Sequence, residues 1–418
     1  MDQEAPLRQS KCGIFIVPRS SYEWKGNEAG WITTAGWASA GQQLWGEAIV
    51  TTTDGVFSPQ KAMLFPQVSE SAPTKRRYRT LRHFVPEVAI TALKDYNLKK
   101  SKPKEWPIER NGTLKGKEIK MIWQRHDLFP GPGRKLADKF QVPLVTSVEA
   151  LAVWEARKWG VKRPIWGRLL EDRVEAKALM ESDLICCVSQ EVKDKVISLG
   201  IPEEKVIITP NRVDSTLFNP DIDGSAVSNK YKLHGKIVLG WTGSFRGFHA
   251  LDNVISAFDM IHRKYPQTVL MLVGDGLEFE PVKEMIAERN LVDAVIMPGR
   301  KKFNEIPDYV ANFDISIVSA RSAEGFHYSP LKLREYMAAG KPVVAPNAGD
   351  LPDIFSDGQD LLLYEAGNPR SLAEKILMLI EDPDKHQELQ QNAISWFQNE
   401  GAWVHELKKV CDILKISY

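Results

Sequence analysis

Cysteine is scarce in this 418-residue chain, and long apolar runs and a strong net charge are absent. The four cysteines form no CxxC pair and no metal-ligand spacing, which excludes a disulfide scaffold and favours a reducing compartment. No apolar run approaches about eighteen residues, so no transmembrane helix is predicted. The polar start MDQEAPLRQS has no signal-peptide core. With a formal net charge of +1, nothing indicates a nucleic-acid partner. We therefore expect a cytoplasmic protein.

Basic residues are concentrated in the first half of the chain, in KRRYRTLR (75–82) and LKKSKPK (98–104). A solvated surface is the simpler interpretation of these runs. A platform for an anionic acceptor or an acidic membrane surface stays open as the alternative. Peripheral contact with the inner face of a membrane, through a basic N-terminal domain, is therefore an alternative to a purely cytoplasmic location.

Short apolar runs rich in Val, Ile and Leu alternate with helical or polar segments along most of the chain. This pattern predicts α/β domains whose parallel sheets are buried on both faces. The expected strands are 12–18, 47–53, 117–124, 142–147, 184–189 and 205–210 in the first half, and 236–241, 268–274, 293–299, 313–319 and 341–346 in the second. Helices are expected over about 250–264 and 278–289.

The chain length suggests two domains, and residues 210–224, rich in Pro, Asn and Asp, read as the linker. We predict an N-terminal domain over 1–213, with a C-terminal helix (398–418) packing back on it, and a second domain over 214–397. Ligands of such sheets bind beyond the carboxyl ends of the strands. The loops expected there carry glycine, arginine, lysine and histidine, which favours a nucleoside-diphosphate ligand.

The stretch FHYSPLKLREYMAAGKPVVA (326–345) predicts a helix over about 330–339, with Ser329 as N-cap and Gly340 at the C-terminal break. Lys332 falls in the first turn, where the helix dipole disfavours a cation. A bound anion would explain the lysine. A solvated lysine paired with Glu335 is the alternative, and the residues alone do not decide between the two.

SPLKLREYMAAGKPVVA (329–345) and the segment over 347–376 resemble the retaining glycosyltransferases of family 4, which have the GT-B fold. VLGWTGSFRGFHALDNVISAF (238–258), LMLVGDG (270–276), ADKFQVPLV (137–145) and the segment over 181–214 resemble the same family. The resemblance implies two doubly wound Rossmann-like domains facing across a cleft. It also implies transfer of a sugar from a UDP- or GDP-sugar, with UDP favoured, to a hydroxyl of a glycan, glycolipid or small molecule, as in polysaccharide biosynthesis. Retention of configuration, no cofactor and no metal are expected.

The resemblance also assigns roles to residues. Glu335 would bind the ribose of the nucleotide, and Arg246 and Lys332 would neutralise the diphosphate. The diphosphate would be lined by Ser329, Pro330, Leu331, Gly243 and His249, and the nucleoside by Gly274, Asp275 and Arg300. A glycine loop of the first domain, which includes Asn27 and Gly30, would close over the phosphates. His126 would lie close to the donor sugar.

Two positions depart from the family pattern. His327 stands eight residues before Glu335, where the family has a glutamate that contacts the donor sugar, and Glu324 is the candidate replacement. Ser244 stands where an arginine is common, and Arg246 would supply that charge. The alternatives that remain are a degenerate GT-B subunit that binds a partner and a GT-B sugar-nucleotide epimerase. A dinucleotide oxidoreductase is disfavoured, because no G-x-G-x-x-G follows the first strand.

Overall fold

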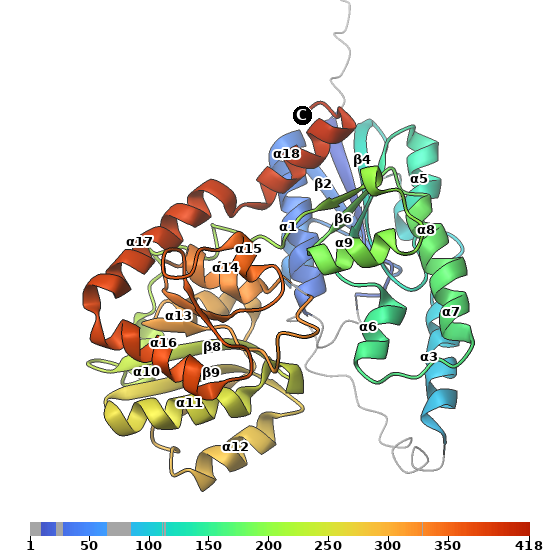
Figure 1. Ribbon diagram of the computed structural model, residues 1–418. Helices are drawn as coiled ribbons and strands as arrows, with labels where there is room; N and C mark the ends of the chain where they lie inside the picture. Colours follow the sequence, from blue (N-terminus) through green and yellow to red (C-terminus); the bar gives the residue numbers. More distant parts are fainter. Residues whose placement is uncertain (1–9, 22–27, 65–84, 111, 113, 328) are drawn as a thin grey trace, which may run out of the picture. The chain divides into compact units, whose positions relative to one another are not determined.

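The computed structural model describes residues 10–21, 28–64, 85–110, 112, 114–327 and 329–418. The chain divides into two compact units (Figure 1). Unit 1 comprises Met1–Pro210 and Trp403–Tyr418, and unit 2 comprises Asn211–Ala402. The sequence placed the corresponding divisions at 213/214 and 397/398.

Unit 1 is built on a seven-stranded sheet of order β3-β2-β1-β4-β5-β6-β7. The strands are β1 (Ser10–Ile16), β2 (Glu47–Thr51), β3 (Val56–Phe57), β4 (Lys117–Arg125), β5 (Leu144–Val148), β6 (Leu184–Cys187) and β7 (Val206–Ile208). All neighbours pair in parallel except β3, which pairs antiparallel with β2 at the edge of the sheet. The buried strands are near-continuous apolar runs, as expected for a sheet covered on both faces.

The helices of unit 1 connect these strands. They are α1 (Glu28–Trp45), α2 (Pro59–Leu64), α3 (Glu87–Lys100), α4 (Pro107–Arg110), α5 (Gly133–Phe140), α6 (Ala152–Lys158), α7 (Trp166–Leu170), the π-helix η4 (Glu171–Glu175), α8 (Ala176–Met180), α9 (Gln190–Ile197), the 3-10 helix η5 (Glu203–Lys205) and the C-terminal α18 (Trp403–Leu414). The ring centroids of Trp403 and Trp37 of α1 lie 5.5 Å apart. The last helix of the chain is therefore part of the unit 1 core.

Unit 2 contains a six-stranded sheet of order β10-β9-β8-β11-β12-β13. The strands are β8 (Ile237–Phe245), β9 (Thr268–Gly276), β10 (Val295–Gly299), β11 (Ile315–Ile317), β12 (Val343–Pro346) and β13 (Leu362–Tyr364). All of them pair in parallel. The doubly wound fold class predicted from the sequence is thus confirmed in both units.

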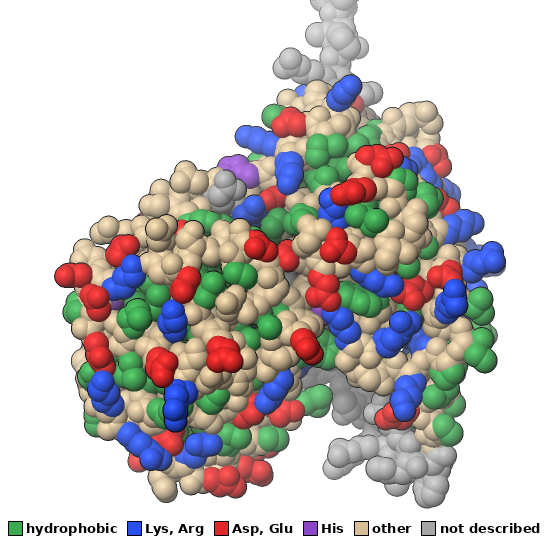
Figure 2. Space-filling view, viewed as in Figure 1, with side chains coloured by type: hydrophobic (Ala, Val, Ile, Leu, Met, Phe, Trp, Pro, Cys, Tyr) green, Lys and Arg blue, Asp and Glu red, His purple; other side chains and the backbone are tan. Residues whose placement is uncertain are grey.

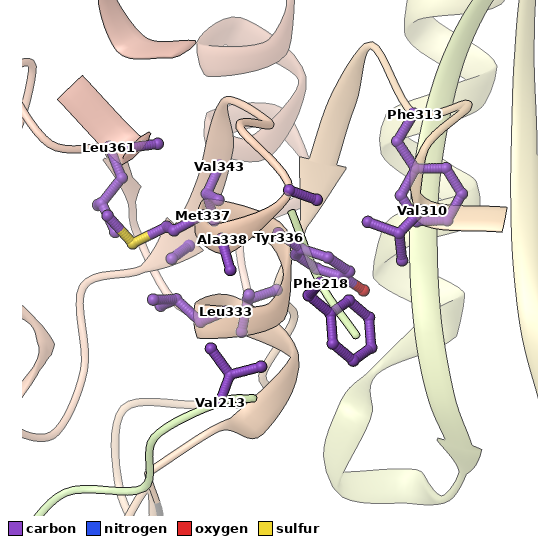
Figure 3. Close-up of a cluster of buried hydrophobic side chains, with 14 of the residues drawn as sticks. Val213, Phe218, Val310, Phe313, Leu333, Tyr336, Met337, Ala338, Val343 and Leu361 are labelled. Carbon is purple, nitrogen blue, oxygen red and sulfur yellow. The ribbon is translucent and has the colours of Figure 1, made fainter. Parts of the chain in front are cut away.

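The helices of unit 2 cover this sheet. They are α10 (Ser225–Tyr231), η6 (Gly247–His249), α11 (Leu251–Lys264), α12 (Phe279–Glu288), η7 (Phe303–Glu305), α13 (Ile306–Val310), α14 (Leu331–Ala338), α15 (Leu351–Ile354), α16 (Pro369–Glu381) and α17 (Pro383–Glu400). Leu333, Tyr336 and Met337 of α14 point into the buried core (Figure 3). These contacts fix the rotation of α14 and hence the direction of its other side chains.

The end of α14 follows the prediction, but its beginning does not. Gly340 has a φ of +66°, and the N–H groups of Gly340 and Lys341 bond the carbonyls of Met337 and Tyr336 at 3.0 and 2.9 Å. This is a Schellman ending. At the other end, Pro330 rather than Ser329 is the N-cap. The prediction of Ser329 as N-cap was wrong.

The Ser329 hydroxyl is engaged elsewhere. It accepts hydrogen bonds from Arg334 Nη1 at 2.8 Å and from the Asn211 backbone N–H at 3.2 Å, and the Ser329 carbonyl accepts one from Asn211 Nδ2 at 2.8 Å. Arg334 is buried, so its guanidinium needs such acceptors. These bonds tie the start of unit 2 to the approach of α14.

The visible face of the molecule carries acidic and basic side chains interspersed (Figure 2), in keeping with the net charge of +1. In the part of the chain that the structure describes, no helix combines the length and the apolar character that crossing a membrane requires.

Candidate functional site

The candidate site lies in unit 2, where the strand order reverses between β8 and β11. Such reversals leave a crevice at the carboxyl ends of the strands, and ligands of open α/β sheets bind there. Ser319, just after β11, bridges the two sides. Its hydroxyl accepts a hydrogen bond from Trp241 Nε1 of β8 at 3.0 Å and donates one to the His249 carbonyl. The loops that follow β8 and β11 are thereby held together.

Trp241 forms the floor of this site. Its buried ring lies under the Lys332 amine, with Nζ 3.8 Å from the ring centroid, and stands edge-on to the His249 ring at 5.4 Å. A cation over the face of a tryptophan is electrostatically attracted by the ring. Trp241 therefore brings the side chains of Lys332 and His249 close to the same ring.

Lys332 brings a buried amine to the site. Its Nζ is shielded from solvent and has no hydrogen-bond partner among the described residues. Lys332 and Glu335 both lie in the described part of the chain, and they form no ion pair. The alternative of a solvent-exposed lysine paired with Glu335 therefore does not hold. Burial lowers the pKa of the Lys332 amine to about 7, against the opposing attraction of Glu335. A buried hydrogen-bond donor without an acceptor is unfavourable unless a ligand provides the acceptor.

Tyr336 sets the position of Lys332. It lies one turn further along α14, on the same face, and its hydroxyl accepts a hydrogen bond from the Thr242 backbone N–H at 2.7 Å. The hydroxyls of Tyr336 and Thr242 lie 3.0 Å apart. This brace holds the first turns of α14 against the end of β8, beside Gly243.

Glycine at 243 leaves room for the amine. A Cβ at this position would lie 2.7 Å from Lys332 Nζ, and the φ of +145° is one that other residues rarely adopt. Gly274 lies beside it on β9, with a φ of +147°, and a Cβ there would lie 1.8 Å from the Gly243 carbonyl oxygen. Both predicted site glycines are therefore required by the backbone at the strand ends.

Glu335 carries a buried carboxyl on α14, next to the buried amine. Burial raises the pKa of Glu335 to about 7, although the charge of Lys332 opposes this. A carboxyl and an amine that both titrate near neutral pH are common at functional sites. Lys332 and Glu335 are therefore candidates for a functional role.

The loop after β8 adds one neutral and one charged side chain. Burial, and then the charges of Lys332 and Arg246, lower the pKa of the His249 imidazole well below its usual value. His249 is therefore neutral at pH 7. Arg246 is exposed, three residues before it on the same loop. Asp275, at the carboxyl end of β9, and Arg300, directly after β10, are also exposed. The Asp275 carboxylate accepts a hydrogen bond from the Gly276 N–H at 2.7 Å.

The two residues considered for the donor sugar differ in their surroundings. His327 is buried, and its Nδ1 lies 2.8 Å from the Gly325 carbonyl. Glu324 is exposed. Their roles in sugar binding stay predictions. Tyr328, between His327 and Ser329, lies outside the described residues.

In unit 1, His126 follows β4 and is held by a fully buried carboxylate. Its Nε2 lies 2.8 Å from Glu175 Oε1, and the same carboxylate accepts hydrogen bonds from the N–H groups of Ala152 and Val153 at the start of α6. Glu175 belongs to the π-helix η4. This is the environment of a satisfied buried histidine, and the predicted contact with a donor sugar stays a prediction.

Gly30 does not lie in a loop. It belongs to the first turn of α1, and its carbonyl accepts hydrogen bonds from the hydroxyls of Thr33 and Thr34 at 3.2 and 2.8 Å. The predicted loop conformation is thus wrong for Gly30, because the helix begins at Glu28, and the predicted contact of Gly30 with the phosphates stays a prediction. Asn27, the other residue predicted in that loop, lies outside the described residues.

Among the residues with described positions, no cluster of three or more His, Cys, Asp or Glu side chains could hold a metal ion. All four cysteines are buried free thiols, and burial raises the pKa of Cys12 to about 12.

Sequence reasoning missed four residues that shape the site: Trp241, Thr242, Ser319 and Tyr336. The tyrosine stands four residues after Lys332, a spacing that places both on one helix face and could have indicated the brace. For Ser319 no sequence signal exists, because its two hydrogen bonds depend on the pairing of β8 and β11.

Comparisons with solved structures place the fold in a known class. The HepE protein of Anabaena, solved with UDP and glucose, matches with a TM-score of 0.63 and 19% identity, over 96% of this chain and 99% of that one. At this identity the match establishes the fold alone. The chain therefore has the two-domain, Rossmann-like architecture of the GT-B proteins.

Sequence comparisons relate unit 2 to the glycosyltransferases. Residues 227–396 match the model of the glycosyl transferases group 1, in agreement with the glycosyltransferase resemblance seen in the sequence. An uncharacterized glycosyltransferase of Methanocaldococcus jannaschii is 30% identical over 54% of this chain and 57% of its own length. A GDP-mannose-dependent phosphatidylinositol monomannoside mannosyltransferase of Mycobacterium tuberculosis is 22% identical over 56% of this chain and 62% of its own. The alignments thus span little more than half of these relatives.

Proposed function

We propose that the protein is a glycosyltransferase that moves a sugar from a nucleoside diphosphate to an acceptor hydroxyl. The observation that carries the proposal is the Lys332 amine, buried without a hydrogen-bond acceptor among the described residues at the switch point of the unit 2 sheet. An anion bound there would satisfy the amine and restore its charge. The group 1 domain over 227–396 supports the sugar-transfer chemistry.

A diphosphate fits the arrangement around Lys332. The N-terminal turn of α14 presents N–H groups without helical acceptors, and the helix dipole favours an anion at that end. The missing side chain at Gly243 leaves space next to the amine. Arg246 would add a second cation from the exposed loop. His249, which is buried beside Lys332 and Trp241, would offer a ring nitrogen for a hydrogen bond with the anion.

Glu335 is proposed to bind the ribose. A buried carboxylate accepts hydrogen bonds from vicinal hydroxyls, and those bonds offset its desolvation. Gly274, Asp275 and Arg300, at the ends of β9 and β10, are proposed to lie along the nucleoside. UDP is favoured as the nucleotide because the structural neighbour HepE was solved with UDP and glucose. The mycobacterial relative uses GDP-mannose, which keeps GDP as the second nucleotide to test.

The transfer breaks the bond between the anomeric carbon and the diphosphate oxygen and forms one to the acceptor oxygen on the same face of the sugar. The acceptor proton passes to an oxygen of the leaving phosphate, so charge and atoms balance without a side-chain base. Lys332, Arg246 and the N–H groups of α14 stabilise the negative charge that develops on the leaving diphosphate. Retention of configuration and independence of metal are part of this proposal.

A second candidate is a subunit that has kept the fold but lost transfer. The observation that favours it is His327, buried against the Gly325 carbonyl at the position where the family has a glutamate. Sugar-nucleotide epimerisation is the remaining alternative.

NMR analysis of products from a panel of UDP- and GDP-sugars, each incubated with glycan, glycolipid and small-molecule acceptors in the presence of EDTA, tests these functions. A glycoside with the donor's anomeric configuration supports the proposal. An inverted product contradicts retention, and a new sugar nucleotide indicates an epimerase. An intact donor bound without any product indicates the binding subunit.

A further inference from the structure

Large apolar side chains are exposed along one side of unit 1. Leu93 and Tyr96 lie on α3, Leu169 lies on α7, and the connection between α6 and α7 exposes three more. Together these six residues are called the α3–α7 patch: Leu93, Tyr96, Trp159, Val161, Ile165 and Leu169. Green side chains alternate with blue ones at the right-hand edge of Figure 2, over α3 and α7 as labelled in Figure 1. Exposed apolar residues that gather in this way mark interaction surfaces.

The most exposed member of the patch sits in a strained turn. Ile165 has φ 61° and ψ −60°, and the Trp166 N–H bonds the Pro164 carbonyl at 2.6 Å, which defines a γ-turn of the rare type. A β-branched residue rarely adopts a positive φ. Ile165 is nevertheless 87% exposed, so burial of its own side chain does not account for the conformation. Strain of this kind occurs where function requires a side chain in that place.

A buried carboxylate clamps both sides of the strained turn. Asp95 of α3 accepts hydrogen bonds from Arg163 Nε and Nη2 at 2.8 and 3.0 Å and from Trp166 Nε1 at 3.1 Å. These two residues flank Pro164 and Ile165, so the turn is held from before and after. The clamp keeps Ile165 pointing away from the protein and joins α3 to α7.

The patch lies in strongly basic sequence. Residues 156–170 contain five Arg or Lys and no acid, and residues 96–104 contain four Lys and no acid. Several of these cations are paired within the protein, such as Arg157 with Glu171 and Arg168 with Asp172, both at 3.4 Å. Lys99, Lys104 and Lys162 are exposed and form no ion pair among the described residues. The patch therefore offers both apolar tips and cations to a partner.

We propose that the α3–α7 patch docks the protein on an anionic lipid surface. Ile165 and Leu169 enter the boundary between head groups and acyl chains, Trp159 and Tyr96 lie at head-group level, and Lys99, Lys104 and Lys162 meet the lipid phosphates. A nucleic acid would satisfy the cations but gains nothing from Ile165. A second copy of the chain would bring two basic surfaces together, which is unfavourable. The proposal does not depend on the donor chemistry of unit 2.

Co-sedimentation of the full chain with vesicles tests the proposal. The vesicles contain either phosphatidylcholine alone or equal parts of phosphatidylcholine and phosphatidylglycerol. Binding to the anionic vesicles is expected to be about tenfold or more stronger, and Ile165→Asp is expected to weaken it about tenfold or more. The matched control is Leu277→Asp in unit 2, where an equally apolar side chain is 90% exposed and its substitution should leave vesicle binding unchanged.

Ile165→Gly separates docking from folding. Glycine accepts the positive φ without strain, so this variant is expected to melt no lower than the wild type while binding anionic vesicles more weakly. Equal binding of Ile165→Asp and Leu277→Asp would overturn the proposal, as would equal binding to both kinds of vesicle. Salt could abolish binding to the anionic vesicles while Ile165→Gly and Ile165→Asp leave it unchanged. That result would indicate a soluble polyanion as the partner of the patch instead. If the wild type forms a dimer and Ile165→Asp is a monomer, the partner of the patch is a second copy of the chain.

Discussion

The candidate site depends on one residue, Lys332, and in particular on its buried amine. Trp241 lies under it, Gly243 leaves room beside it, and Tyr336 fixes the helix that carries it. None of these neighbours accepts a hydrogen bond from the amine. A buried amine without an acceptor is expected to weaken the fold of the ligand-free protein, which is typical of residues retained for binding.

Lys332→Met should stabilise the ligand-free protein and remove its affinity for nucleoside diphosphates. Burial lowers the pKa of the amine from 10.5 to about 7, so the unfolded chain holds more protons than the folded one between these values. Stability lost to Lys332 is therefore largest below about pH 7 and declines as the pH rises. The gain in melting temperature should be greater at about pH 6 than at about pH 9. A variant that melts lower than the wild type at both pH values would show that the lysine supports the fold.

Gly274→Ala should destabilise unit 2 by about 3 kcal/mol or more, because the added Cβ would meet the Gly243 carbonyl and the φ of +147° is strained for alanine. Gly299→Ala is the matched control. Gly299 also has a positive φ, of +74°, but nothing lies within 4 Å of its Cβ position. It should lose only about 1 kcal/mol. Urea unfolding of both variants makes the comparison, and equal losses would show that the close contact of the strands is not required.

At the scale of elements, the strands of both sheets were predictable and the beginnings of some helices were not. Apolar runs such as 268–274 identify buried parallel strands because both faces of the sheet are covered. The short edge strands β3 and β13 were not predicted, whereas the equally short β7 and β11 lie within the longer predicted segments 205–210 and 313–319. The start of α14 was misassigned because Arg334, five residues on, takes the Ser329 hydroxyl that would otherwise cap the helix.

Candidate site residues on glycine-rich strand ends could be predicted, because a strand that ends in glycine, as at Gly243 and Gly274, signals close approach of the backbone. Residues whose role arises only from folding could not. Ser319 bridges two strands that are far apart in sequence, and the contact of Glu175 with His126 depends on the register of a π-helix.

Ser329→Ala should lower the free energy of unfolding by about 1–3 kcal/mol, because it removes the acceptor of hydrogen bonds from buried Arg334 and from the Asn211 N–H. Its effect on nucleotide affinity should be smaller than that of Glu335→Ala, since the Ser329 hydroxyl is already engaged within the protein. Urea denaturation and calorimetric titration measure the two quantities. A variant with unchanged stability but strongly reduced affinity would instead make Ser329 a direct ligand of the diphosphate.

At the scale of the whole molecule, the chain leaves unit 1 after Pro210, forms unit 2, and returns to unit 1 with α18. The contact of Trp403 with α1 is close, since a Cβ on Gly36 would lie 2.3 Å from the Trp403 indole nitrogen. The completed core of unit 1 therefore requires the last sixteen residues of the chain, Trp403–Tyr418.

Trp403→Ala should destabilise unit 1 by about 3–5 kcal/mol, because a large cavity would open against Trp37 and Gly36 of α1. The core of unit 2 does not include this residue. Hydrogen exchange should show faster opening in α1 and β1 than in the wild type, with α11 and β9 unchanged. Equal loss of protection in both units would show that they unfold as one.

The central claim is that unit 2 binds a nucleoside diphosphate through Lys332, and thermal-shift measurements test it most directly. Wild-type protein and Lys332→Met would be melted with UDP, GDP, ADP, dTDP or CMP in the presence of EDTA. A ligand at a hundred times its dissociation constant adds about 2.7 kcal/mol of stability. The account predicts that one nucleoside diphosphate raises the melting temperature of the wild type and leaves that of Lys332→Met unchanged. No shift of the folded wild type with any of them, or an equal shift of both proteins, would contradict it.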